Sequence, residues 1–259
     1  MAEQQDLKKL SEILPTMTNP AQEQTKMNCS KHGEYQSTKH DILGKAFYSK
    51  CPKCVQDVET SLKAEEGKIE WLSKRRSNMR ISNYKINNPQ QRAVVERVSK
   101  FVVNFDKVKE LGSCMVFIGN PGTGKTHLAT AVGVDLHLKG YSVGYYRLYD
   151  LMARIKATYG RGATETEGGV IKAISEFDLV ILDEVGLKTF TETEIALTYQ
   201  IIDKRYEAVR PTLIVSNLSM KDLEENLGSR TIDRLFENHG AVLVFDWESM
   251  RRNQIRKDA

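Results

Sequence analysis

The 259-residue sequence lacks an apolar run of about 18 residues, the length that a membrane-spanning helix needs. Cysteine is scarce, and its four residues are too unevenly placed for a disulfide framework. Residues 1–10 do not contain the apolar segment of a secretory signal. A large excess of one charge is also missing, because 38 basic and 34 acidic residues leave a net charge of +4. We therefore expect a cytoplasmic protein with no membrane partner, and the net charge alone does not indicate nucleic acid.

The composition is that of a globular protein, with 40% hydrophobic and 28% charged residues. At roughly 150 residues per domain, the length allows one or two domains. Residues 60–80 are rich in charge, and residues 71–85 hold only basic charges. We place a basic hinge over this stretch, between an N-terminal region (1–80) and a second domain (81–259).

Short apolar runs alternate with helical stretches throughout the second domain, which predicts an α/β fold with a parallel five-stranded sheet. A possible capping box, Thr191 with Glu194, predicts the start of one helix, and residues 220–227 predict another. The expected strands are residues 114–119, 142–148, 178–183, 212–217 and 241–246.

A complete G-x-x-x-x-G-K-T motif follows the first of these strands and opens a helix, which is the context of a phosphate-binding loop. Its glycines let consecutive backbone N–H groups face an anion at the positive end of the helix. Lys125 is expected to reach the β- and γ-phosphates, and the Thr126 hydroxyl to ligate Mg²⁺. The predicted nucleotide-binding residues are Gly119, Asn120, Pro121, Gly122, Thr123, Gly124, Lys125, Thr126 and His127.

Two carboxylates, Asp183 and Glu184, follow the buried run of residues 179–182, at the strand end where open α/β sheets bind ligands. We expect Asp183 to hold Mg²⁺ through water and Glu184 to orient or deprotonate the water that attacks the γ-phosphate. Asn217 ends the next strand, where it either contacts the γ-phosphate or only starts a turn before a helix capped by Ser219.

Together these residues resemble the AAA+ ATPases of the DnaC-type helicase-loader group, which is related to the IstB-type transposition helpers. The resemblance covers about residues 84–259 and implies ATP and Mg²⁺ as ligands. It implies that Asn217 is sensor 1, that Arg230 is the arginine finger with Arg234 as competitor, and that Arg251 is the sensor 2 arginine. As in the loader group, we expect no C-terminal lid domain of the kind found in larger AAA+ enzymes, because only thirteen residues follow the last predicted strand. The matching blocks are residues 119–126, 179–184, 201–206, 210–217, 227–235 and 245–251.

Residues 150–167 stand where this group inserts an extra helix, which with the loop after the acidic pair faces single-stranded DNA in the resemblance. Cations for phosphates and aromatic rings for bases suit that role, and an ordinary amphipathic helix with solvated charges is the alternative. The predicted DNA-binding residues are Arg154, Lys156, Tyr159, Arg161, Lys188 and Phe190.

Two short motifs near the N-terminus, C-x₂-H at Cys29–His32 and C-x₂-C at Cys51–Cys54, predict a closed tetrahedral Zn²⁺ site. His40 is the alternative fourth ligand, and Gly33 suits a tight turn after His32. Because the protein would fill all four positions, the metal is expected to be structural.

The function that fits best is an ATPase, stimulated by DNA or a partner, that loads a hexameric replicative helicase onto single-stranded DNA and self-associates on that helicase. By resemblance, the N-terminal region holds the helicase. The alternative is an IstB-type transposition helper that binds duplex DNA and a transposase. A nucleotide-binding scaffold without turnover is a third reading, against which Glu184 argues.

Overall fold

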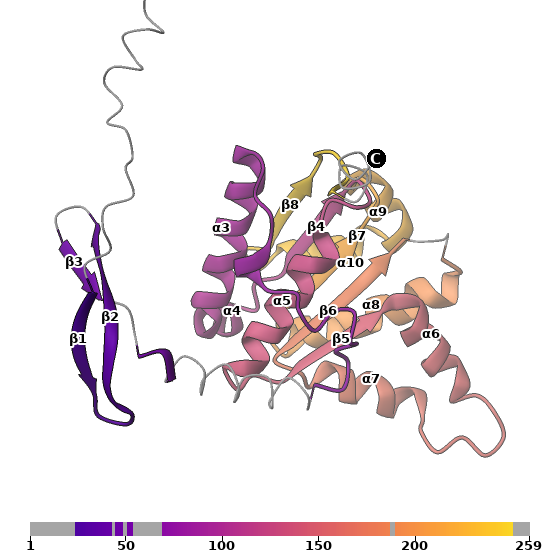
Figure 1. Ribbon diagram of the computed structural model, residues 1–259. Coiled ribbons are helices and arrows are strands. Elements are labelled where there is room, and N and C mark those ends of the chain that lie inside the picture. Colours follow the sequence, from indigo (N-terminus) through magenta and orange to yellow (C-terminus); the bar gives the residue numbers. More distant parts are fainter. Residues whose placement is uncertain (1–23, 43–44, 49–50, 54–68, 187–189, 251–259) are drawn as a thin grey trace, which may run out of the picture. The chain divides into compact units, whose positions relative to one another are not determined.

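The computed structural model describes residues 24–42, 45–48, 51–53, 69–186 and 190–250 (Figure 1). The chain divides into two units, residues 1–64 and residues 65–259. No helix among these described residues is long and apolar enough to cross a bilayer.

The first unit contains a small antiparallel sheet of strands β1 (Gln24–Cys29), β2 (Gly33–Ile42) and β3 (Lys45–Tyr48), in that order. A short turn joins β1 to β2, and Gly33 closes it with a φ of 75°. Glycine is favoured at this position because a side chain is strained at positive φ. The turn leaves Cys29 and His32 on either side of the bend.

The second unit is built on a parallel sheet of five strands in the order β5-β6-β7-β4-β8. The strands are β4 (Met115–Gly119), β5 (Val143–Arg147), β6 (Leu179–Val185), β7 (Thr212–Ser216) and β8 (Ala241–Phe245). All five lie within a residue or two of the strands predicted from the apolar runs. The α/β fold and the parallel five-stranded sheet are therefore confirmed.

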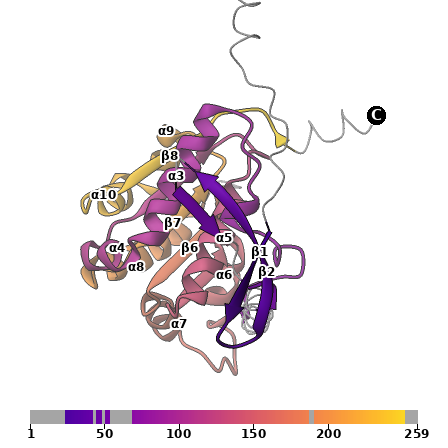
Figure 2. The same cartoon turned by 60° about the vertical axis from the view of Figure 1, so that its left-hand side comes forward.

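Side chains of each strand alternate between two hydrophobic clusters, one on each face of the sheet. In β4, Met115 and Phe117 join the first cluster, whereas Val116 and Ile118 join the second. The first cluster is covered by α3 (Pro89–Val103), α4 (Phe105–Leu111) and α5 (Lys125–Leu138). The second is covered by α6 (Leu148–Ala157), α7 (Glu167–Ser175), α8 (Glu192–Glu207), α9 (Met220–Leu227) and α10 (Ser229–Phe236) (Figures 1 and 2). In the described part of the chain, no helical domain follows β8.

The predicted helix starts are confirmed by their caps. Thr191 accepts a hydrogen bond from the Glu194 backbone, and the Glu194 carboxylate accepts one from the Thr191 backbone, which completes the capping box of α8. Ser219 caps α9 by accepting from the backbone N–H of Asp222. Sequence signals of this kind act within a few residues, so they survive in the tertiary structure.

The basic stretch predicted as a hinge is instead packed on the second unit. Residues 69–84, which we call the strap, contain the short 3₁₀ turn η1 (Ile81–Asn83). Ile69 and Tyr84 are buried, and Trp71 and Ile81 pack against the first hydrophobic cluster. The two units meet at residues 64 and 65, within the charged stretch of residues 60–80 but earlier than the predicted boundary after residue 80. Charge composition does not reveal that the apolar residues of 69–84 pack against the second unit.

The fully buried side chain of Arg205 ties the end of α8 to the sheet. Its guanidinium donates to the Thr212 hydroxyl at 3.0 Å and to the carbonyl oxygens of Phe177 at 2.9 Å and Pro211 at 2.6 Å. Burial without a carboxylate partner lowers the pKa of Arg205 to about 9. Arg205 belongs to one of the sequence blocks that carry the family resemblance, and the structure gives it an architectural role.

Candidate functional site

The predicted phosphate-binding loop joins β4 to α5, at the C-terminal edge of the sheet. Gly119, Gly122 and Gly124 all adopt positive φ, and a side chain on Gly119 would overlap the Phe245 backbone. The buried Lys125 ammonium donates to the carbonyl oxygens of Gly119 at 2.6 Å and Asn120 at 2.7 Å. Burial lowers the pKa of Lys125 to about 8, although the negative charge of Asp183 opposes this shift.

Two aromatic side chains from opposite ends of the second unit hold the middle of this loop. The Tyr84 hydroxyl and the Trp247 indole N–H both donate to the Thr123 carbonyl oxygen, at 2.7 Å and 3.0 Å. His127 contacts the strap through the Arg80 carbonyl oxygen, at 2.9 Å. Burial raises the pKa of Tyr84, so its hydroxyl stays a donor. Sequence analysis missed the roles of Tyr84 and Trp247.

The segment after β8 covers the other side of the loop. The Met250 N–H donates to the Gly122 carbonyl oxygen at 2.9 Å, and the Asn120 N–H donates to the Phe245 carbonyl oxygen at 3.0 Å. A side chain on Gly122 would overlap Ser249. These contacts bring the block of residues 245–250 onto the phosphate-binding loop. Arg251, the next residue and a predicted nucleotide contact, lies outside the described residues.

The oxygens expected to hold Mg²⁺ lie together. Thr126 opens α5 and Asp183 ends the apolar part of β6, and the Thr126 hydroxyl lies 3.4 Å from Asp183 Oδ1. A hydroxyl is one of the hard oxygen ligands that Mg²⁺ prefers, and Mg²⁺ usually keeps several waters, which a nearby carboxylate can hold. The pair therefore fits this cation.

The other oxygen of Asp183, Oδ2, faces two side chains that sequence analysis did not single out. It accepts a hydrogen bond from the Tyr145 hydroxyl at 2.5 Å and lies 3.9 Å from the Arg76 guanidinium. Tyr145 belongs to β5, which pairs with β6 in register, Arg147 opposite Asp183. Tyr145 lies two positions before Arg147, so both side chains point to the same face of the sheet as Asp183. A polar group at this position of the predicted strand was the signal in the sequence that could have identified Tyr145.

Glu184 stands at an irregularity in the sheet. The pairing of β6 with β7 shifts register between Leu182 and Val185, and Glu184 has a φ of 59°. A bulge next to a site commonly redirects a side chain, and left-handed backbone at a non-glycine residue costs about 1–3 kcal/mol that the surrounding structure must offset. The strained position is the one that the sequence predicted to act on water.

Asn217 lies directly after β7, whose neighbours in the sheet are β4 and β6. The strand order therefore brings Asn217 to the same edge as the phosphate-binding loop and the acidic pair. Its side chain is exposed. The same segment also contains the turn and the Ser219 cap of the alternative reading, and the contact of Asn217 with the γ-phosphate stays a prediction.

The two competing arginines of α10 have different environments. Arg230 is exposed in the first turn of the helix, and it makes no ion pair within the described ranges. Arg234 is half-buried, with Nε 3.1 Å from Asp203 Oδ1 and its guanidinium carbon 4.2 Å from the centre of the Tyr206 ring. Intrachain contacts therefore occupy Arg234 and leave Arg230 available to another molecule.

Three of the six predicted DNA-binding residues have acidic partners in the chain. The Arg154 guanidinium forms an ion pair with Glu165, with 2.5 Å between Nη2 and Oε1. The Tyr159 hydroxyl donates a hydrogen bond to the Glu167 carboxylate. Lys156 pairs at 2.9 Å with Glu194, whose side chain is 2% exposed. Backbone donation from Thr191 and the Lys156 ammonium together lower the pKa of Glu194 to about 2. Lys156 thus holds the N-terminus of α8.

The remaining predicted DNA contacts differ among themselves. Arg161 is exposed in the loop between α6 and α7, which projects from the second unit in Figure 1. Phe190 packs against the second hydrophobic cluster and is half-buried, so part of its ring is covered. Lys188 lies outside the described residues.

In the first unit, three predicted zinc ligands come together. One ligand atom each from Cys29, His32 and Cys51 lies within 4.8 Å of the others. His32 Nδ1 lies 3.8 Å from both sulfur atoms, close to the about 3.6 Å that bonds of about 2.3 and 2.0 Å give at a tetrahedral Zn²⁺. Cys54 lies outside the described residues, and His40 has its backbone in β2.

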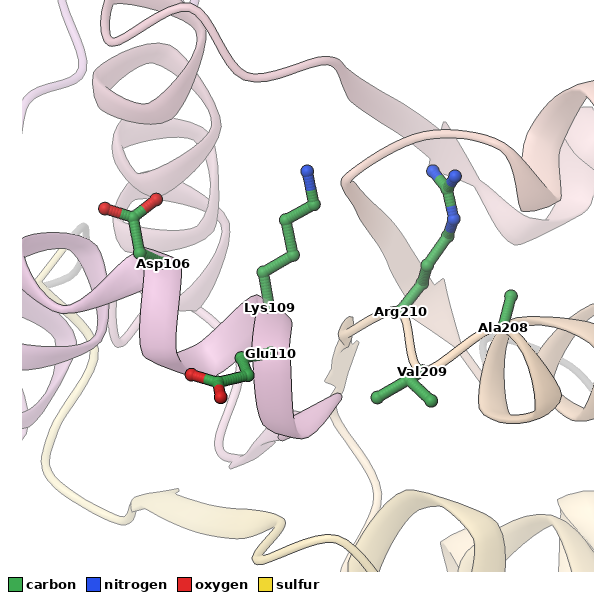
Figure 3. Close-up of a pocket in the computed structure, with 6 residues that line it drawn as sticks. All are labelled: Asp106, Lys109, Glu110, Ala208, Val209 and Arg210. Atoms are coloured by element: carbon green, nitrogen blue, oxygen red, sulfur yellow. The ribbon is translucent and has the colours of Figure 1, made fainter.

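Figure 3 shows a pocket lined by residues of α4 and of the turn between α8 and β7. That turn and the end of α4 precede β7 and β4, so the pocket lies at the opposite edge of the sheet from the phosphate-binding loop. Lys109, one of its lining residues, pairs with Asp178 at 2.6 Å. The pocket is therefore separate from the site described above.

Comparison with known proteins gives the same assignment as the motifs. The sequence model of the IstB-like ATP binding proteins matches residues 73–258. The replicative helicase loader DnaC of Buchnera aphidicola (from Acyrthosiphon pisum) is 35% identical over 175 residues, which are 68% of this chain and 70% of that protein. DnaC of Escherichia coli K12 is 32% identical over 181 residues, covering 70% and 72% of the two chains. A crystal structure of the DnaC helicase loader superposes with a TM-score of 0.60 at 27% identity, over 67% of this chain and 100% of that one.

Proposed function

Because the chain belongs to the family of IstB-like ATP binding proteins and is related to the DnaC helicase loaders, we propose that it loads a replicative helicase onto single-stranded DNA. ATP binding and hydrolysis act as the switch. The observation that carries the proposal is that relatives named as helicase loaders are 35% and 32% identical to this chain over 175 and 181 residues. The complete phosphate-binding loop beside Asp183 supplies the ATPase chemistry.

In the proposed reaction, the loop backbone and Lys125 bind the β- and γ-phosphates, and Thr126 and Asp183 hold Mg²⁺. When bound, the cation would neutralise the negative charge that develops on the phosphate oxygens in the transition state. Glu184 orients the attacking water and accepts its proton, while Asn217 contacts the γ-phosphate. Supporting this division of roles, all these groups lie at one edge of the sheet.

We further propose that Arg230 completes the site of a neighbouring copy when the protein assembles on the helicase. Its exposure and the intrachain contacts of Arg234 support the choice of Arg230 over Arg234. The role of Arg251 as sensor 2 is proposed only from the sequence resemblance.

For DNA, the proposal now gives most weight to Arg161. Arg154, Lys156 and Tyr159 contact acidic partners, so DNA phosphates would have to displace a carboxylate from each. Lys188 and Phe190 remain proposed contacts in the loop after the acidic pair. Phosphate contacts of this kind weaken as salt rises, because binding releases counterions from the DNA.

In the first unit, we propose a structural Zn²⁺ held by Cys29, His32, Cys51 and Cys54, with His40 as the alternative fourth ligand. The first three ligands are close enough for one ion. The family match starts at residue 73, beyond this unit. From the resemblance to the helicase-loader group, we assign helicase binding to this unit.

The metal proposal predicts one zinc per chain by elemental analysis of protein purified without chelator. Cys51→Ser is expected to lose the zinc and the protease resistance of residues 24–53, because metal binding supplies on the order of 10 kcal/mol to so small a unit. Cys114→Ser is the control, because Cys114 lies in the core of the second unit. Metal-free protein with an equally resistant first unit would contradict the proposal.

The loading proposal predicts that the full-length protein captures a hexameric replicative helicase and, with ATP, prefers single-stranded DNA to duplex of matched length and salt. Arg161→Ala is expected to weaken DNA binding several-fold and to leave helicase capture unchanged. Lys172→Ala, a change at a cation of α7, is the control. The IstB-type family match favours a second candidate, a transposition helper. A clear preference for duplex DNA, together with capture of a transposase, would replace the first function by the second.

A further inference from the structure

The carboxylate of Asp183 makes two kinds of contact, one with each oxygen. Oδ1 faces the Thr126 hydroxyl and also accepts the N–H of Glu184 at 2.9 Å. Oδ2 accepts from the Tyr145 hydroxyl at 2.5 Å, and both side chains are buried. The hydrogen bond from Tyr145, together with the one from the Glu184 N–H, restrains the plane of the carboxylate. The terminal torsion of an aspartate is otherwise broad, so loss of the Tyr145 hydroxyl removes one of these two restraints.

Tyr145 is itself held by the strap. The Trp71 and Tyr145 rings stack with centroids 5.3 Å apart and an interplanar angle of 15°. The Arg76 guanidinium carbon lies 4.8 Å from the Tyr145 ring centre, and the same guanidinium approaches Asp183. Gly133 of α5 lies against the Trp71 ring, where a side chain would overlap the indole. The absence of a side chain at Gly133 lets the strap lie close to α5.

We propose that Tyr145 is a positioning residue for Asp183, which holds Mg²⁺ through water, and that Trp71 and Arg76 of the strap hold Tyr145 in place. The proposal rests on the proposed function, because it takes Asp183 as part of the Mg²⁺ site. Groups that hydrogen-bond to a metal ligand orient it, and their loss typically lowers metal affinity about 10- to 100-fold. The strap also follows the first unit closely in the sequence. A change in how the strap packs would therefore alter the position of Tyr145 and, through it, the Mg²⁺ site.

A tyrosine hydroxyl carries its proton at physiological pH and a carboxylate can only accept, so the short contact is a hydrogen bond that Tyr145 donates to Asp183. Tyr146, the next residue of β5, is on the opposite face of the sheet and packs against the second hydrophobic cluster. It offers a matched control, since Tyr146→Phe removes a hydroxyl from the same strand without touching Asp183.

The test uses the full chain, with Mn²⁺ as the probe for the Mg²⁺ site and electron paramagnetic resonance to measure its binding in the presence of ATP. Tyr145→Phe is expected to weaken Mn²⁺ binding about 10- to 100-fold, and Tyr146→Phe to leave it unchanged. ATP affinity in EDTA is expected to be the same in both variants. Hydrolysis by Tyr145→Phe should need more Mg²⁺ for half its maximal rate and approach the normal rate at saturating Mg²⁺.

Two further variants separate the role of the strap from the role of Asp183 itself. Trp71→Leu retains the Tyr145 hydroxyl and loses the stacked ring, so it is expected to weaken Mn²⁺ binding in the same direction by a smaller factor. Asp183→Asn is expected to lose Mn²⁺ binding. If it does and both Tyr145→Phe and Trp71→Leu bind Mn²⁺ normally, the positioning proposal alone is overturned. If Asp183→Asn binds Mn²⁺ normally, the ligand assignment in the proposed function fails as well.

Discussion

Glu184→Gln protein is expected to bind ATP with near-normal affinity and to hydrolyse it at least about 100-fold more slowly, because a general base typically contributes 10²- to 10⁴-fold. The amide keeps the shape of the side chain but cannot accept a proton from water. The backbone at Glu184, with a φ of 59°, is compatible with either residue because the substitution changes only the end of the side chain. Phosphate release and equilibrium binding of labelled ATP measure the two quantities separately.

Two control variants accompany the Glu184→Gln measurement. Lys125→Ala is expected to lose ATP binding itself, because it removes the cation that lies within the phosphate-binding loop. Glu192→Gln changes an exposed glutamate in the first turn of α8 and is expected to behave like the unaltered protein. If Glu184→Gln hydrolyses ATP at the normal rate, another residue positions the water.

Loss of the arginine finger is expected to have an effect of similar or larger size. Arg230→Ala should retain ATP and lower hydrolysis by a factor that reaches about 10³ to 10⁵ for other arginine fingers. Arg234→Ala should act differently, because Arg234 pairs with Asp203 and packs on Tyr206. For Arg234→Ala we expect a lower unfolding temperature. At temperatures where this variant is folded, we expect it to lower the hydrolysis rate less than Arg230→Ala does.

Mixing two inactive variants tests whether Arg230 acts on a neighbouring copy. Lys125→Ala lacks ATP binding and Arg230→Ala lacks the finger, so each is inactive alone. In a mixed assembly, an intact phosphate-binding loop can meet an intact Arg230. Recovery of hydrolysis in the mixture is the expected result. No recovery, with co-assembly shown by cross-linking, would mean that Arg230 does not act between copies.

The sequence by itself determined the features that depend on residues close together in the chain. The phosphate-binding loop, the acidic pair after β6 and the caps of α8 and α9 each lie within a few residues. The five strands were predictable because each is a short apolar run, and four of them are largely buried, whereas Val244 of β8 at the sheet edge is half exposed. The two short motifs also predicted that Cys29, His32 and Cys51 would lie together, and their ligand atoms lie within 4.8 Å of one another, whereas zinc binding itself stays a proposal.

Only the tertiary structure decided which distant residues surround these features. It packed the basic stretch of residues 71–84 against α5 and β5 where charge composition predicted a hinge, and it thereby brought Arg76 to Asp183. It also paired Lys156 with Glu194, which removed a cation from the predicted DNA surface. The physical reason is that burial and ion pairing depend on which surfaces meet, and local sequence patterns do not encode the partner of an exposed or half-buried side chain.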